Sequence, residues 1–219
     1  MASTTQGSAA PHVGSTVSVL PVSAGRERVG ALSDWSVGPA GLVVTASITL
    51  TEDAVDALTG RRVWARIESQ DGGVRVLEGV AVAGIEPTEL GLTGVLALAE
   101  ERRRTAPRVE TSRAVRVSLE ALALRHASDA HTVDLSRTGA RLRMPAASTE
   151  DALAGGAMVE VDIAVGQDET VTAGAEVIRV DHARGELAVR FVDLAEEDAV
   201  RLDRAVLSEL SAQRAQPAS

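Results

Sequence analysis

Apolar and polar residues alternate over short segments throughout the first hundred residues of the chain. In residues 62–68, Val63, Ala65 and Ile67 alternate with polar or aromatic neighbours, and the turn Asp71-Gly72-Gly73 follows. A period of two is typical of a strand with one buried face, and such a turn favours a hairpin. The pattern predicts strands over residues 15–20, 42–50, 62–68, 74–82 and 92–98, with one helical turn over residues 52–58.

The second half of the chain shows the same alternation more clearly. It predicts six strands, over residues 115–121, 130–135, 140–144, 159–165, 171–180 and 187–191. Strands this short and this closely spaced are typical of a barrel or a sandwich. A turn over residues 136–139 would join the second of these strands to the third.

From residue 195 the period changes from that of a strand to that of a helix. Four apolar residues fall on one helical face: Ala199, Leu202, Val206 and Leu210. We therefore expect an amphipathic helix that packs on the preceding strands. Asp193 is a candidate N-cap, and the acidic residues that follow it suit the positive end of the helix dipole. We expect the chain to fray after Ala212.

A polar junction separates the two β patterns. Residues 99–108 include Glu100-Glu101-Arg102-Arg103-Arg104, and Pro107 forbids a regular continuation of either pattern. We therefore expect an all-β protein, in which an Arg-rich linker joins two small antiparallel β-barrel domains and a C-terminal α-helix packs on the second barrel. The expected parts are a flexible tail (1–14), an N-terminal β domain (15–98), the linker (99–108), the second domain (109–211) and a flexible tail (212–219).

The composition excludes several classes of protein and site. Apolar residues make up 45% of the 219 residues, which is enough to bury a core, and cysteine is absent. Disulfides, thiolate metal sites and cysteine nucleophiles are therefore excluded. No apolar run is long enough for a transmembrane helix, and the first residues do not resemble a signal peptide, so we expect a cytoplasmic protein.

The net charge of −9 hides a basic segment in the middle of the chain. Residues 102–143 contain ten arginines and four acidic residues, whereas residues 1–101 contain six and twelve, and residues 144–219 contain six and fifteen. A basic segment inside an acidic chain disfavours general nucleic-acid binding, which uses a broad positive face. It suits a small, multiply charged anion; arginines on a solvated barrel face are the alternative.

Two motifs in this segment could bind such an anion. The first is Arg103-Arg104-Thr105-Ala106-Pro107-Arg108. Its guanidinium groups are planar and permanently charged, and they can bind phosphate or the edge of a guanine through two hydrogen bonds. On its own, a run of arginines is also what a solvated linker contains.

The second motif, Asp134-x-Ser136-x-x-Gly139, lies between two predicted strands. In an extended chain Asp134 and Ser136 project to the same side, where the carboxylate can accept hydrogen bonds from guanine and the hydroxyl can donate one. Gly139 permits either a positive φ or a close approach of two backbones. We expect Asp134 at the surface of the barrel; an ordinary hairpin turn is the alternative interpretation.

Taken together and in this order, Arg104-x-x-x-Arg108, Asp134-x-Ser136-x-x-Gly139 and the strands and helix that follow resemble the PilZ domain. Members of that family bind the bacterial second messenger cyclic di-GMP. Residues 186–194, with Phe191 shortly before the helix, resemble the last strand of the family. The arrangement of two domains resembles that of flagellar brakes, although no motif of the first domain matches.

The resemblance implies a site for cyclic di-GMP made of six residues: Arg103, Arg104, Arg108, Asp134, Ser136 and Gly139. The arginines would clasp the phosphates and the guanine bases, the carboxylate and the hydroxyl would hold a guanine, and the glycine would shape the turn. Arg137, Arg141 and Arg143 lie near this turn. They could raise the local potential, or they could simply be outward-facing residues.

No other group of residues indicates chemistry. His126 and His131 lack a third metal ligand in register, so we expect surface histidines and no metal site. Trp35 and Trp64 fit the core of the first domain better than a stacking platform. The chain contains no Walker or G-x-G-x-x-G motif and no recognisable nucleophile, so we expect no enzyme and no cofactor.

The leading hypothesis is a non-catalytic receptor for cyclic di-GMP that signals by interdomain rearrangement and regulates flagellar motility or the output of envelope and exopolysaccharide. We expect a monomer or homodimer with a protein partner in the flagellar motor or the envelope machinery, and no nucleic-acid partner. One alternative is a nucleic-acid-binding β-barrel, for which only three aromatic residues are present to stack on bases. The other is a scaffold of the same fold without a ligand.

Overall fold

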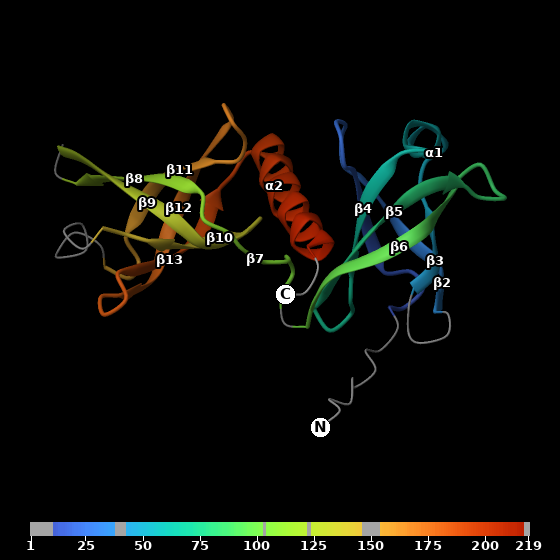
Figure 1. Ribbon diagram of the computed structural model, residues 1–219, viewed down its shortest axis with the longest axis horizontal. Helices are drawn as coiled ribbons and strands as arrows, with labels where there is room; N and C mark the ends of the chain where they lie inside the picture. The colour runs from blue at the N-terminus through green and yellow to red at the C-terminus, as the bar shows by residue number, and fades with distance from the viewer. Residues whose placement is uncertain (1–10, 38–42, 103, 122–123, 146–153, 217–219) are drawn as a thin grey trace, which may run out of the picture. The chain divides into compact units, whose positions relative to one another are not determined.

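The computed structural model describes residues 11–37, 43–102, 104–121, 124–145 and 154–216 (Figure 1). The chain divides into two compact units, Met1–Pro107 and Arg108–Ser219. Each unit is built mainly from antiparallel strands. Among the described residues, no helix is both long enough and apolar enough to cross a membrane.

The first unit is a closed antiparallel barrel. Its strands are β1 (Thr16–Pro21), β2 (Arg28–Val37), β3 (Val43–Thr49), β4 (Arg62–Glu68), β5 (Val74–Ala83) and β6 (Glu89–Glu101). They follow the order β1-β2-β3-β6-β5-β4, and pairing of β1 with β4 closes the barrel. The short helix α1 (Glu52–Leu58) adds Ala54, Val55 and Leu58 to the core.

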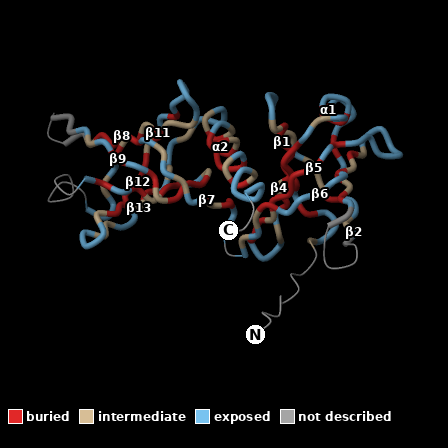
Figure 2. Tube along the Cα trace, in the orientation of Figure 1, coloured by how far each residue is buried: buried red, intermediate tan, exposed pale blue. Residues whose placement is uncertain are grey.

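The core of this barrel follows the alternation predicted for its strands. Val63, Ala65 and Ile67 are fully buried inside the barrel, as are Ile48 and Leu92 from β3 and β6. Figure 2 colours buried residues red, and red stretches run along the strands of this barrel. In β4, the period of two therefore identified the face that turns inward.

Two features of the first unit differ from the prediction. Strand β2 was not predicted, because Gly30 and a bulge between Leu32 and Asp34 interrupt its alternation. Strand β6 runs to Glu101, so it includes three residues expected in the linker. The polar side chains of Glu100 and Glu101 do not prevent pairing, because β5 supplies backbone partners and Arg75 forms an ion pair with Glu100 at 3.5 Å.

The second unit is also a closed barrel, and together the two barrels confirm the predicted fold class. Its strands are β7 (Val109–Glu110), β8 (Ala114–Ala121), β9 (Leu124–Ser136), β10 (Gly139–Arg143), β11 (Met158–Ala164), β12 (Thr170–Asp181) and β13 (Glu186–Asp193). The order is β10-β13-β12-β11-β8-β9, and pairing of β9 with β10 closes the barrel. The short β7 pairs with β9 beside Asp134.

Helix α2 (Glu196–Ala215) packs on the second barrel through the predicted apolar face, since Ala199, Leu202, Val206 and Leu210 are all buried. Both ends of the helix differ from expectation. The N-cap is Ala195 and not Asp193, because Asp193 is still paired with Gly174 in the sheet. The helix also continues to Ala215, where we expected fraying after residue 212. Near this end, Gln213 Nε2 donates to the carbonyl of Glu110 at 2.9 Å.

Candidate functional site

The second sequence motif forms the hairpin between β9 and β10. Strand β9 ends at Ser136 and β10 begins at Gly139, so only Arg137 and Thr138 lie in the turn. Ser136 is almost fully buried, and its hydroxyl donates to the carbonyl of Gly139 at 3.0 Å. The hydroxyl that the sequence suggested for ligand contact therefore holds the two ends of the hairpin together.

Gly139 is required by the close approach of two strands. A Cβ atom at this position would lie 2.3 Å from the carbonyl oxygen of Val189 in β13, far inside van der Waals contact. Its φ does not lie in the left-handed region. Of the two reasons that the sequence offered for this glycine, backbone proximity is confirmed and positive φ is wrong.

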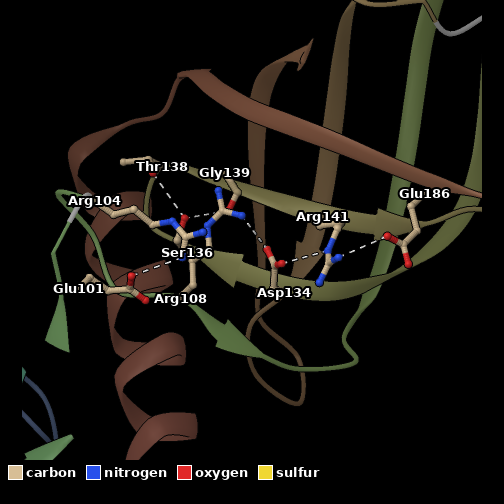
Figure 3. A network of polar contacts seen from close by, with 9 residues as sticks. All are labelled: Glu101, Arg104, Arg108, Asp134, Ser136, Thr138, Gly139, Arg141 and Glu186. Carbon is tan, nitrogen blue, oxygen red and sulfur yellow. Dashed lines mark hydrogen bonds and ion pairs between the residues drawn. The ribbon is translucent and has the colours of Figure 1, made fainter. Parts of the chain in front are cut away.

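Asp134 is a buried carboxylate that two arginines hold (Figure 3). Arg108 Nη1 lies 3.1 Å from Asp134 Oδ1, and Arg141 Nε lies 3.0 Å from Oδ2. The register explains both contacts, because Arg141 pairs directly with Asp134 across the hairpin and Arg108 immediately precedes β7. The expectation of a surface carboxylate is wrong: only 12% of the Asp134 side chain is exposed, and the side chains of Arg108 and Arg141 lie against it.

A second buried carboxylate, Glu186 at the start of β13, continues the chain of contacts. Arg143 Nη2 lies 2.7 Å from Glu186 Oε1, and Arg141 Nη1 lies 3.5 Å from Oε2. The hydrogen bond from Arg143 lowers the pKa of Glu186, helped by the charges of Arg141 and Arg184 and opposed by burial. Arg141 thus bridges two carboxylates and fixes the orientation of Asp134.

These five residues form what we call the arginine network: Arg108, Asp134, Arg141, Glu186 and Arg143. As described, it contains three guanidinium groups and two carboxylates, so it carries an excess of one positive charge. The side chains of Arg108 and Arg143 are 36% and 62% exposed, so an anion can reach them from solvent. Exposed guanidinium groups beside a fixed carboxylate can bind a ligand that carries both phosphate and hydrogen-bond donors.

The remaining residues of the first motif lie in the first unit. Arg104 is half exposed, and its Nη1 lies 3.3 Å from Glu101 Oε2 at the end of β6. Arg103 lies outside the described residues. Of the six predicted site residues, Asp134, Ser136 and Gly139 lie on one hairpin of the second barrel. Arg108 contacts Asp134 of this hairpin from the residue before β7, and Arg104 belongs to the other unit.

Sequence reasoning missed two carboxylates near the hairpin. Glu186 was passed over because the alternation of β13 is clearest from Leu187 onwards. Asp203 is buried on α2, and its Oδ2 lies 2.7 Å from Arg137 Nη1 in the hairpin turn. An acidic residue between Leu202 and Val206 on the apolar face of a helix was the available signal, because a charge is rarely buried without a partner.

The other candidate residues lie away from this hairpin turn. His131 is exposed on β9, the side chain of His126 lies outside the described residues, and no group of three metal-ligating residues occurs in the described ranges. Trp64 is buried and donates to Glu78 at 3.1 Å, and Trp35 packs against the core of the first barrel beneath Arg75, as expected for structural residues.

Comparison with known proteins gives one family match. Residues 102–208 match the family model described as PilZ domain. This range contains β7–β13, the arginine network and most of α2. No curated protein matches the chain.

Several solved structures are similar over most of the chain at low identity. The inhibitor of motility from Bacillus subtilis (MotI/DgrA) is 10% identical with a TM-score of 0.42, covering 94% of this chain and 99% of that one. YcgR from Escherichia coli in complex with c-di-GMP is 14% identical with a TM-score of 0.42, covering 92% and 86%. The MrkH–c-di-GMP complex from K. pneumonia is 14% identical with a TM-score of 0.40, covering 93% and 90%.

Proposed function

We propose, from the premise that residues 102–208 belong to the PilZ domain family, that this protein is a non-catalytic receptor for cyclic di-GMP. The observation that carries the proposal is the arginine network, in which exposed guanidinium groups flank the fixed carboxylate of Asp134. Cyclic di-GMP has two phosphates and two guanines. It therefore offers both an anion for the arginines and N–H donors for the carboxylate.

Binding at this site would be an exchange of partners. In the structure Asp134 accepts from Arg108 and Arg141. A bound guanine would donate N1–H and N2–H to Asp134 in place of Arg108, and Arg108 would turn to a phosphate of the same ligand. Each charged group keeps a partner of opposite charge or a hydrogen-bond donor, so no charge is left buried and unpaired. Arg141 stays bound to Glu186 and keeps Asp134 in position.

Arg103 and Arg104 would complete the site from the linker. Arg104 would leave Glu101 for the ligand, which is inexpensive because the ion pair is exposed and weak. Ser136 and Gly139 would act by holding the hairpin in shape, not by contacting the ligand through the hydroxyl. Ordering the linker residues 102–108 on the ligand would then change the direction in which the first unit leaves the second.

The biological output would be this change in domain arrangement. Among the described residues of the site, no group is suited to bond-making chemistry, and we propose that the signal passes as a new surface for a protein partner. By the resemblance, that partner belongs to the flagellar motor or the envelope machinery. The ligand can shift the arrangement only by as much as it binds one arrangement better than the other.

Isothermal titration calorimetry with cyclic di-GMP tests the receptor proposal, and cyclic di-AMP is the matched control ligand. Both ligands have the same cyclic sugar–phosphate backbone with two phosphates. Adenine, unlike guanine, has no N1–H that could donate a hydrogen bond to Asp134. We expect saturable binding of cyclic di-GMP and at least tenfold weaker binding of cyclic di-AMP, a loss of about 1.4 kcal/mol. Absence of cyclic di-GMP binding overturns the proposal. Equal binding of both ligands overturns the role of Asp134.

Small-angle scattering with and without saturating cyclic di-GMP tests the rearrangement separately. We expect a changed radius of gyration together with increased hydrogen-exchange protection in residues 102–108. Unchanged scattering and unchanged protection at saturation would overturn the rearrangement and leave the receptor proposal in place.

A further inference from the structure

Helix α2 buries one carboxylate against the hairpin that carries the proposed site. Asp203 is 3% exposed, whereas the other buried residues described on this helix are apolar. Its Oδ2 lies 2.7 Å from Nη1 of Arg137. Arg137 is one of the two turn residues between β9 and β10, directly after Ser136 and three residues after Asp134. An ion pair therefore connects the hairpin turn to the helix.

The two partners differ in how easily they reach solvent. The side chain of Arg137 is 24% exposed, whereas that of Asp203 is 4% exposed. An anion that arrives from solvent can therefore contact Arg137 without entering the space beneath the helix. Like a carboxylate, a phosphodiester group carries one negative charge and two oxygens that can accept a pair of hydrogen bonds from a guanidinium group.

We propose that Arg137 exchanges Asp203 for a phosphate of the bound ligand, and that α2 responds to this exchange as the output element of the domain. The inference rests on the proposed function, because it requires a phosphate ligand at the hairpin. Arg137 is thereby assigned as an additional ligand-binding residue, and Asp203 as the group that holds it when the site is empty.

The helix is expected to respond because a buried carboxylate that loses an ion pair with a guanidinium group is strongly destabilised. The most direct relief is a movement of the N-terminal half of α2 that exposes Asp203 to water. The C-terminal half is held independently, by Gln213 on the carbonyl of Glu110 at 2.9 Å and by Glu209, whose Oε2 lies 3.7 Å from Arg113 Nη2. The exchange would therefore tilt or loosen one end of the helix.

The exchange makes an unusual prediction about binding. In Asp203→Asn the competing negative charge is removed, so Arg137 is available to the ligand without first leaving a carboxylate. The coupling is reciprocal: if ligand binding breaks the Arg137–Asp203 ion pair, then the ion pair must lower the affinity for the ligand. This variant should therefore bind cyclic di-GMP more tightly while its fold becomes less stable. A merely structural ion pair predicts unchanged or weaker binding.

The test is calorimetric titration of the parent, Asp203→Asn and the control Asp198→Asn with cyclic di-GMP. Asp198 lies on the same helix, and its carboxylate faces Arg201 at 3.1 Å, so the control removes the same charge without touching Arg137. We expect about 5- to 50-fold tighter binding for Asp203→Asn and less than a twofold change for Asp198→Asn. Unchanged or weaker binding by a folded Asp203→Asn overturns the inference.

Arg137→Gln provides a second variant if Asp203→Asn does not fold. We expect it to weaken binding about tenfold, and ligand should then no longer lower hydrogen-exchange protection around residue 203, as it should in the parent. Parent affinity in Arg137→Gln, or unchanged protection of α2 in the ligand-bound parent, overturns the inference while the receptor proposal stands. Failure of the parent to bind cyclic di-GMP overturns both.

Discussion

The two barrels bury carboxylates in different ways. In the first barrel, Glu78 is buried on β5 and contacts Arg62 and the indole nitrogen of Trp64. In the second barrel, Asp134 and Glu186 are joined through Arg141, and each contacts a further arginine. The first arrangement matches a buried charge to a guanidinium group and an aromatic donor. The second assembles three guanidinium groups around two acids.

This difference shows that the barrel architecture does not by itself create the site. Both units are closed antiparallel barrels with aliphatic cores. The candidate site arises where one hairpin and its neighbouring strand place an excess of arginines beside fixed carboxylates. The candidate site is therefore a property of side-chain pairing across particular strands. Matched substitutions in the two barrels can break or sharpen the comparison.

The largest expected effect comes from removing one arginine of each barrel. Arg108→Ala should weaken cyclic di-GMP binding by about 2–4 kcal/mol, because it removes a charge-assisted contact to the ligand. Arg62→Ala, which removes the arginine beside Glu78, should leave affinity within twofold of the parent. Arg108→Lys should restore little, because an ammonium group cannot form the paired contact. The affinities are measured by calorimetry. Equal affinities of the two alanine variants would contradict the assignment of the ligand site to the second barrel.

Glycine substitutions provide a comparison at matched strain. A Cβ at Gly30 in β2 would lie 2.2 Å from the carbonyl oxygen of Thr49, much as one at Gly139 would lie 2.3 Å from that of Val189. Gly30→Ala and Gly139→Ala should each lower the free energy of unfolding by about 1–3 kcal/mol, measured by urea denaturation. Only Gly139→Ala should also weaken ligand binding. If both variants weaken binding equally, the effect comes from a general loss of stability and not from a change in the hairpin.

Neutralising one buried acid in each barrel separates binding from stability. Asp134→Asn and Glu78→Gln should each cost about 1–2 kcal/mol of unfolding free energy, a figure reduced from that of a fully buried pair because the arginine partners are partly exposed. Asp134→Asn should also reduce affinity for cyclic di-GMP, and Glu78→Gln should not. Lost stability with unchanged affinity in Asp134→Asn would assign that carboxylate a structural role only.

The smallest expected effect is the pH dependence that Glu186 contributes. Its pKa is lowered from the ordinary value of 4.5 in the folded state. A lowered pKa stabilises the fold above the ordinary value, and this contribution is lost as the pH falls through the lowered one. Urea denaturation of the parent and Glu186→Gln, from about pH 7 to about pH 3, should show the parent's advantage shrinking at the acid end. A constant difference would contradict the lowered pKa.

Much of the fold was accessible from the sequence because it depends on local patterns. Alternation located most of the strands and their inward faces, and the helical period located the buried face of α2. The errors occurred where neighbours override a local signal. Strand β2 forms despite Gly30 and a bulge, and β6 continues through Glu101 because β5 supplies its hydrogen-bond partners. Asp193 remains in the sheet because Gly174 is paired with it.

The sequence by itself determined which residue types lie close together along the chain, including Arg108 before one strand and Asp134, Ser136 and Gly139 around one turn. Only the tertiary structure decided their partners. It turned the Ser136 hydroxyl onto its own hairpin, buried Asp134 between two arginines, and brought Glu186 and Asp203 to the same region. The physical reason is that spacing fixes neighbours within a strand or a turn, whereas contacts between strands and with the helix depend on register and packing.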